Sequence, residues 1–186
     1  MKNVKYGQCI KCGKTYPATP DLTTCTCGGV LEIVYDYDEI KKRLTKAVLA
    51  ERTERTMWRY RELLPIEETT EPTPLRVGWS PLYDEPRLAA QLGLKQLWVK
   101  DDGLNPTGAL KDRASAMAVA KAREAGAGVI ACSSTGNAAS SLAGTQRRRP
   151  ATYIFAPLPG AQGQGGPAHD LRRHCHLRPG QLRGDL

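Results

Sequence analysis

Lys111 is the residue whose type and position are best suited to chemistry. It opens a predicted helix directly after the turn residues Asn-Pro-Thr-Gly at 105–108, and the alanine-rich residues 114–125 continue that helix. Partial desolvation beside a second cation, Arg113, would lower the pKa of the amine and favour a Schiff base with a carbonyl compound. Most lysines at helix starts are solvated side chains, but the helix dipole disfavours cations there, so this position indicates an anion or a cofactor.

A second reactive block follows the lysine after a separation that suits one helix plus one strand. Its residues Ser134, Thr135, Gly136 and Asn137 precede another predicted helix, with Ser134 or Thr135 as the N-cap. Hydroxyl and backbone N–H groups at a helix start can bind a carboxylate. Taken alone, the block is more typical of an ordinary helix cap, and only its pairing with the lysine block favours a binding role.

Four cysteines near the N-terminus have the spacing of metal ligands. They form two close pairs and are Cys9, Cys12, Cys25 and Cys27. Pairs of this kind are typical of a zinc ribbon, in which four thiolates surround one ion. A β module spanning residues 1–37 buries too little surface to fold alone, so a metal would supply its stability. Metal-free reduced thiols are the alternative, and a disulfide is disfavoured in the cytosol.

The elements that position these residues follow the order of an α/β protein. Residues 38–77 are predicted to form a helical connector, with one helix over 40–61, and a linker. Over residues 78–157, helices and strands alternate, which predicts a parallel, doubly wound sheet. The predicted helices are 86–92, 111–125 and one from about 136, and the predicted strands are 30–35, 96–99, 128–132 and 151–157.

Composition places the chain among globular proteins without a membrane span. The 186 residues are 40% hydrophobic and 25% charged, and no apolar run approaches the roughly 20 residues of a membrane helix. The N-terminus lacks an apolar signal core, which predicts a cytoplasmic protein. Of the net charge of +8, residues 145–186 contribute +5, from seven arginines and two aspartates.

The last residues lose all regular pattern. Residues 158–186 are rich in Gly, Pro and Arg and show neither helical nor strand periodicity, so we expect this tail to be disordered or read out of frame. Gly160 to Gly166 would make a poor phosphate cradle, because no apolar helix follows them.

Residues 105–113, with the sequence Asn-Pro-Thr-Gly-Ala-Leu-Lys-Asp-Arg, resemble the lysine motif of fold-type II pyridoxal-phosphate enzymes, and most closely that of the threonine synthase family. Residues 133–140 resemble the substrate-carboxylate loop of the same family, in the same order along the chain. The departures are Ala109, Leu110 and Ala114, where the family usually has Ser, Phe and Gly, and none of them removes a reactive group. Many threonine synthases also begin with a cysteine module similar to the one seen here.

The resemblance implies a cofactor, a small amino-acid substrate and a reaction. Lys111 would hold pyridoxal 5'-phosphate, Asn137 would bind its 3'-oxygen, and residues 134–137 would bind the substrate carboxylate. The implied reaction converts O-phospho-L-homoserine and water into L-threonine and phosphate. Threonine dehydratase and cysteate synthase share both blocks and remain alternatives. A different class is a non-catalytic zinc-ribbon protein whose basic tail binds RNA, although nucleic-acid binding is disfavoured because the tail lacks lysine.

The predicted fold is therefore an incomplete doubly wound parallel sheet of a fold-type II enzyme, preceded by a small zinc-ribbon-like β module. In the family, the phosphate anchor and the second wall of the cleft lie well downstream of the Asn137 block, and here 49 residues follow Asn137. We expect a chain truncated or frameshifted after about residue 157 that does not turn over substrate.

Overall fold

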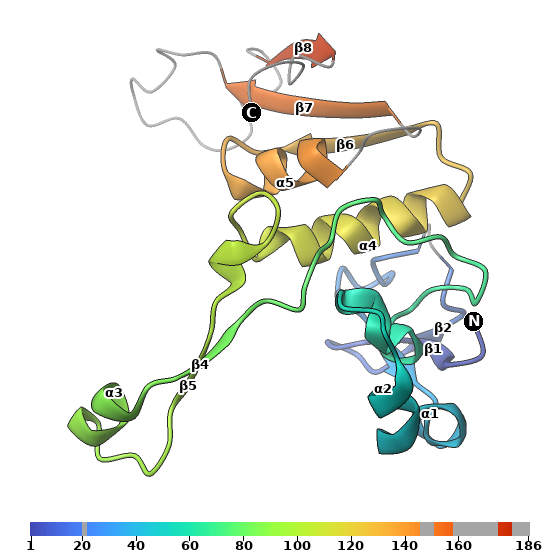
Figure 1. Cartoon of the computed structure of the whole chain (residues 1–186). Helices are drawn as coiled ribbons and strands as arrows, with labels where there is room; N and C mark the ends of the chain where they lie inside the picture. The colour runs from blue at the N-terminus through green and yellow to red at the C-terminus, as the bar shows by residue number, and fades with distance from the viewer. Residues whose placement is uncertain (20–21, 146–150, 158–174, 180–186) are drawn as a thin grey trace. The chain divides into compact units, whose positions relative to one another are not determined.

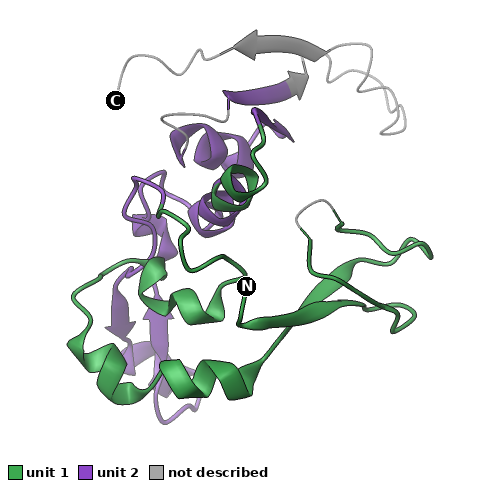
Figure 2. Ribbon diagram, turned by 90° about the vertical axis from the view of Figure 1, so that its right-hand side faces the viewer, with its two compact units in different colours: residues 1–72, 120–127 green, residues 73–119, 128–186 purple. Residues whose placement is uncertain are grey.

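The computed structural model describes residues 1–19, 22–145, 151–157 and 175–179. The chain divides into two compact units (Figure 2): unit 1 comprises residues 1–72 and 120–127, and unit 2 comprises residues 73–119 and 128–186. Among the helices of the described ranges, none combines the length and the apolar character that a membrane crossing requires. Residues 160–166, the glycine-rich stretch that we expect to make a poor phosphate cradle, lie outside the described residues.

Unit 1 begins with a three-stranded antiparallel sheet that carries the cysteines. The strands are β1 (Val4–Cys9), β2 (Thr15–Tyr16) and β3 (Leu31–Tyr35), in the order β2-β1-β3. Cys9 ends β1 opposite Leu31, which begins β3. The predicted strand over residues 30–35 is confirmed.

Three short helices follow, where the sequence pattern predicts a single helix over 40–61. They are α1 (Tyr37–Arg43), α2 (Lys46–Glu51) and the 3-10 helix η1 (Met57–Leu63). The prediction is wrong because Thr45 and Thr56 adopt extended backbone and cap new helices, accepting hydrogen bonds from Val48 N and Trp58 N, both at 3.2 Å.

Unit 2 opens with a two-stranded antiparallel sheet. Strand β4 (Leu82–Asp84) pairs with β5 (Trp98–Lys100), and α3 (Pro86–Gln91) lies between them in the chain. The predicted helix over 86–92 is confirmed. The expectation that the strand near 96–99 joins a parallel sheet is wrong, because in the described residues β5 pairs only with its antiparallel neighbour β4.

The parallel part of the fold is the unit formed by β6 (Val129–Ser133), α5 (Asn137–Thr145) and β7 (Ala151–Pro157). The two strands pair in parallel, from Val129 opposite Ala151 to Ser133 opposite Phe155, and α5 packs against both (Figure 1). This confirms the strand-helix-strand prediction for residues 128–157. The sheet as a whole is mixed, because β8 (Cys175–Pro179) pairs antiparallel with β7. Pairing of main-chain groups at a sheet edge needs no side-chain pattern, which explains why the tail composition gives no sign of β8.

Helix α4 (Lys111–Glu124) confirms the predicted helix over 111–125. It follows the 3-10 turn η2 (Asp102–Leu104) and ends where Gly126 adopts a φ of 66°. Its apolar side chains Ala116, Val119 and Ala120 are fully buried, so the helix is anchored by its small-residue face. The polar residues of the first turn of α4 are not part of this apolar face, and they form part of the candidate site.

Candidate functional site

The turn before α4 is held by a buried carboxylate. Asp112 has no exposed surface, and its two oxygens accept hydrogen bonds from Thr107 N at 2.8 Å and Thr107 Oγ1 at 2.5 Å. Asn105 is also buried; its side chain accepts from Gly78 N and donates to the Asp102 carbonyl, both at 2.9 Å. Gly108 has a φ of 74°, which favours glycine. These contacts fix the direction in which the chain enters α4.

Arg113 forms a clamp on the same corner. Its Nε and Nη2 atoms donate to the two oxygens of Asp102 at 2.8 and 2.7 Å, and the buried Ser80 hydroxyl donates to Asp102 Oδ1 at 2.5 Å. The hydrogen bond from Arg113 holds the pKa of Asp102 well below its usual value and in turn raises that of Arg113. Arg113 is therefore a paired cation that stabilises the turn before α4.

Lys111 itself is exposed at the first position of α4. Within the described part of the chain, its ammonium group makes no hydrogen bond or ion pair. The residues on either side of it, Asp112 and Arg113, are both engaged in holding the corner. Among the described residues, the Lys111 amine thus has no partner, and it follows a turn that is held by hydrogen bonds.

The second block is the loop between β6 and α5. Ser134 N donates to the Phe155 carbonyl at 3.1 Å, and Ser134 Oγ accepts from Gly136 N at 3.2 Å, so Ser134 stabilises the turn and Gly136 immediately precedes the helix. Thr135, Gly136 and Asn137 are exposed. The Thr135 hydroxyl, the Asn137 amide and the start of α5 are thus open to solvent, where they could contact an anionic ligand.

Helices α4 and α5 are joined by small and polar residues. Ser141 Oγ donates to Ser115 Oγ at 2.7 Å, and both side chains are buried. A Cβ atom on Gly144 would lie 2.7 Å from Thr107 Cγ2, so α5 packs tightly against the turn before Lys111. The two predicted blocks therefore belong to one packed body, although in the described residues no hydrogen bond joins Lys111 to residues 134–137.

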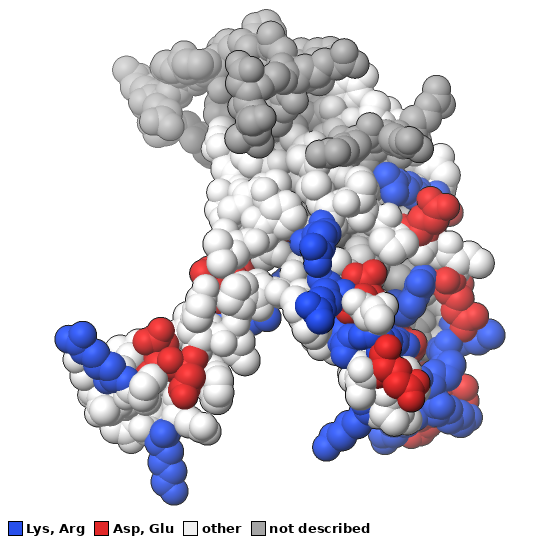
Figure 3. Space-filling model, viewed as in Figure 1, with Lys and Arg blue, Asp and Glu red and all other residues white. Residues whose placement is uncertain are grey.

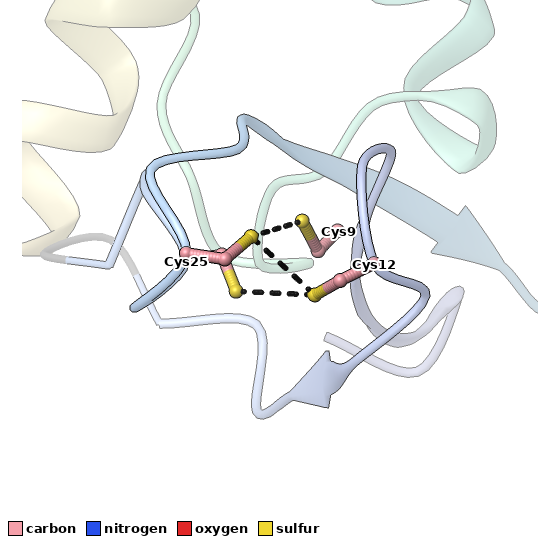
Figure 4. Close-up of side chains that lie close together, drawn as sticks. Cys9, Cys12 and Cys25 are labelled. Atoms are coloured by element: carbon pink, nitrogen blue, oxygen red, sulfur yellow. Dashed lines mark hydrogen bonds between the residues drawn. The ribbon is translucent and has the colours of Figure 1, made fainter.

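The four predicted cysteines come together at the end of the unit 1 sheet (Figure 4). Their sulfur atoms all lie within 4.8 Å of one another. Cys9 to Cys27 and Cys12 to Cys25 are both 3.6 Å apart, and Cys27 to Cys12 is 3.4 Å. A tetrahedral zinc ion with Zn–S bonds of about 2.3 Å requires sulfurs about 3.8 Å apart, so the donor set fits such an ion. A Cβ on Gly29 would lie 2.5 Å from Cys9 Sγ, and only glycine fits beside the cluster.

The thiols influence one another's protonation. The Cys27 N–H and the Tyr16 hydroxyl lower the pKa of Cys25 to about 6. The Gly29 N–H lowers the pKa of Cys27, but hydrogen bonds with the three neighbouring thiols outweigh it and raise this pKa to about 12. Four sulfurs this close cannot all be ionised unless a cation lies among them.

Several residues of both sites escape the sequence motifs. Ser80 and Asp102, 33 and 11 residues from Arg113, are placed beside it only by the fold. Tyr16 is likewise brought to the cysteine site only by the fold, and its hydroxyl lies 3.0 Å from Cys25 Sγ. Asp112 alone carried a sequence signal, since an acidic residue is favourable in the first turn of a helix.

Comparison with known proteins agrees with this geometry. Residues 73–151 match the family of pyridoxal-phosphate dependent enzymes. The threonine synthase of Methanocaldococcus jannaschii is 46% identical over 141 residues, which cover 76% of this chain and 35% of that protein. For the threonine synthase of Methanosarcina acetivorans, the identity is 43% over 138 residues, or 73% and 33% of the two chains. The threonine synthase of Synechocystis is 44% identical over 90 residues, which cover 48% of this chain and 24% of that protein.

The residues that match the family, 73–151, include both the lysine corner and the segment before α5. The chain spans about a third of the length of the first two relatives. Residues 73–151 are thus similar to the pyridoxal-phosphate dependent enzymes, and the relatives named above are threonine synthases.

Proposed function

We propose that this chain carries the lysine-bearing part of a pyridoxal-phosphate site in a threonine synthase-like lyase, which converts O-phospho-L-homoserine and water into L-threonine and phosphate. The observation that carries the proposal is the free, exposed amine of Lys111 on a corner clamped by Asp112 and Arg113. This corner lies within the residues that match the family.

The residues present suit the cofactor. The Lys111 amine would bind the cofactor aldehyde, and the Asn137 amide would donate to the 3'-oxygen. When bound, pyridoxal phosphate supplies an electron sink for charge that develops on the substrate carbons. Lys111, once released from the cofactor, would then move protons at those carbons as a general base and acid. Ser134, Thr135 and Gly136 would hold the substrate carboxylate through hydroxyl and N–H groups.

Other readings of the same blocks are less well supported. Threonine dehydratase and cysteate synthase share them, but the three relatives described above are all threonine synthases. An RNA-binding role would call for a continuous basic surface. Among the described residues on the face shown in Figure 3, acidic and basic side chains are interspersed; most of the basic tail on which the RNA-binding reading depends lies outside the described residues. The lyase reading is therefore preferred.

We also propose that Cys9, Cys12, Cys25 and Cys27 hold one zinc ion, which stabilises residues 1–37. The spacing of the four sulfurs supports this proposal. The ion would have a structural role, because four thiolates leave no position open for substrate. Reduced thiols of this kind suit a cytoplasmic location.

Residues 1–186 alone are proposed to bind the cofactor without appreciable turnover. Lys111 is exposed, so the described residues support the amine without enclosing a substrate around it. Positioning of reactants can supply roughly 7 to 11 kcal/mol of a reaction barrier, and an open site forfeits much of this.

The test is covalent capture of the cofactor. Purified chain is mixed with pyridoxal phosphate, reduced with borohydride and mapped by peptide mass spectrometry, and the label is expected on Lys111. Lys111→Ala should lose the label, whereas Lys95→Ala, which removes another exposed lysine of unit 2, should retain it. Label on Lys100 or Lys121 instead would overturn the assignment. Phosphate release from O-phospho-L-homoserine at an ordinary enzymic rate, abolished by Lys111→Ala, would overturn only the claim of low turnover.

A further inference from the structure

The two cysteine turns of unit 1 supply unequal numbers of hydrogen bonds to their first sulfur. In Cys9-x-x-Cys12, the Cys9 sulfur accepts from the N–H of Lys11, at 3.4 Å, and from that of Cys12. In the shorter Cys25-x-Cys27, the Cys25 sulfur accepts from the N–H of Cys27. The next N–H, of Gly28, donates to the Cys25 carbonyl at 2.8 Å and not to the sulfur. The Cys25 sulfur therefore accepts one backbone hydrogen bond fewer than the Cys9 sulfur does.

A tyrosine occupies the position of the missing donor. The Tyr16 hydroxyl lies 3.0 Å from Cys25 Sγ, and pairing of β2 with β1, with Tyr16 opposite Gly7, fixes the backbone that carries it. The N–H of Thr26 points to the same hydroxyl oxygen at 3.4 Å. A metal-bound thiolate carries no proton, so in the loaded site the hydroxyl must be the donor and Cys25 the acceptor.

We propose that Tyr16 is a positioning residue of the thiolate metal site, which replaces the hydrogen bond that the short Cys25-x-Cys27 turn cannot provide. The proposal rests on the zinc site proposed above. Four thiolates around a divalent ion carry a net charge of −2, and each donor to a sulfur lowers the cost of that charge. The ammonium of Lys14 lies 5.3 Å from the centre of the Tyr16 ring, where it polarises the phenol and strengthens the donor.

The first test compares Tyr16→Phe with Tyr6→Phe. Both variants remove one hydroxyl near the same sheet, but in the described residues the Tyr6 hydroxyl makes no hydrogen bond. Zinc affinity is measured by competition with a chromophoric chelator, on the full chain. Loss of an outer partner of a metal ligand typically costs about 10- to 100-fold in affinity, and a loss of about tenfold or more is expected for Tyr16→Phe alone.

The second measurement separates positioning from a merely structural role. With Co²⁺ in place of zinc, removal of the hydrogen bond raises the energy of the sulfur lone pairs. The sulfur-to-cobalt charge-transfer band of bound Tyr16→Phe should therefore move to longer wavelength. Lys14→Met keeps the Tyr16 hydroxyl, so it should shift the band in the same direction but by a smaller amount. This variant also allows the test to be made if Tyr16→Phe does not fold.

The outcomes are distinct. If wild type binds neither Zn²⁺ nor Co²⁺, the metal site is wrong and this inference falls with it. If wild type binds metal and Tyr16→Phe matches it in affinity and in band position, Tyr16 has no such role while the metal site stands. An unshifted band in both variants, even with weaker binding, would make Tyr16 a packing residue and would also overturn the proposal.

Discussion

The thiol cluster and the lysine corner each place reactive side chains on a short turn, but they are held in opposite ways. The corner is stabilised by an ion pair between Arg113 and Asp102 and by hydrogen bonds from Thr107 to Asp112. The cluster brings together four like groups, whose ionised forms repel one another until a cation joins them. The comparison teaches that the corner can be complete without a cofactor, whereas the cluster would depend on the zinc ion proposed for it.

The largest effect on stability is expected when the cysteine cluster can no longer bind a metal ion. The double variant Cys25→Ser, Cys27→Ser should lose its zinc and unfold the sheet of unit 1, because structural zinc supplies about 10 kcal/mol or more to such modules. Hydrogen exchange should become fast in β1 and β3 and stay slow in β6 and β7. Cys132→Ser, at a free cysteine outside the cluster, is the control. Equal zinc content in the double variant and in wild type would contradict the prediction.

A smaller effect tests whether the corner is fixed by packing as well as by charge. Gly144→Ala places a Cβ atom 2.7 Å from Thr107 Cγ2, and overpacking of this kind typically costs about 1 to 3 kcal/mol. Thr107→Ser removes that methyl group but keeps the hydroxyl that binds Asp112. The double variant should therefore recover most of the stability lost by Gly144→Ala, as measured by urea unfolding.

Gly128→Ala is the matched control for this pair, because its added Cβ would meet nothing within 4 Å. If the losses of Gly144→Ala and Thr107→Ser simply add, the contact between α5 and the turn does not constrain the corner.

The smallest effect concerns the partly exposed pair of Asp102 and Arg113. The pKa of Asp102 is lowered in the folded chain, so the pair contributes stability above the unfolded value of about 4 and loses it as the pH falls toward the folded value. As the pH falls from roughly 6 to roughly 3, across the unfolded pKa of Asp102, wild type should therefore lose more stability than the Asp102→Asn variant does. Thermal unfolding across this range is the measurement. Parallel pH profiles of the two proteins would show that the ion pair contributes nothing.

Local patterns in the sequence were enough to predict α4, β6 and β7 near the lysine corner and β3 near the cysteines, but not β1, β2 or β4, nor the antiparallel pairing of β4 with β5. The alanine-rich run after Lys111 and the β-branched residues around Ile130 and Ile154 specify a helix and two strands by propensity alone. The break at Thr45 was missed, because a threonine that caps a new helix competes with continuation of the old one. The antiparallel pairing of β5 with β4 depends on long-range contacts that no local period reveals.

The candidate sites divide along the same line. Lys111, Asn137 and the four cysteines could be predicted because their chemistry and spacing are local properties of the sequence. Ser80, Asp102 and Tyr16 could not, since each acts on a partner brought near it by folding. The residues predicted from motifs are those that would touch a ligand. The residues found only in the structure are those that position the motif residues.

The closed space beside Cys9 Sγ also constrains how this chain can vary. A Cβ on Gly29 would come within 2.5 Å of that sulfur and 2.8 Å of Lys11 Cβ, and every other coded amino acid carries a Cβ. Each amino-acid replacement at codon 29 therefore pushes on the thiol cluster, whereas alanine at codon 128 or 136 meets no neighbour within 4 Å. We therefore expect relatives that keep the four cysteines to keep glycine at this position, and replacements to occur only where the cluster is absent.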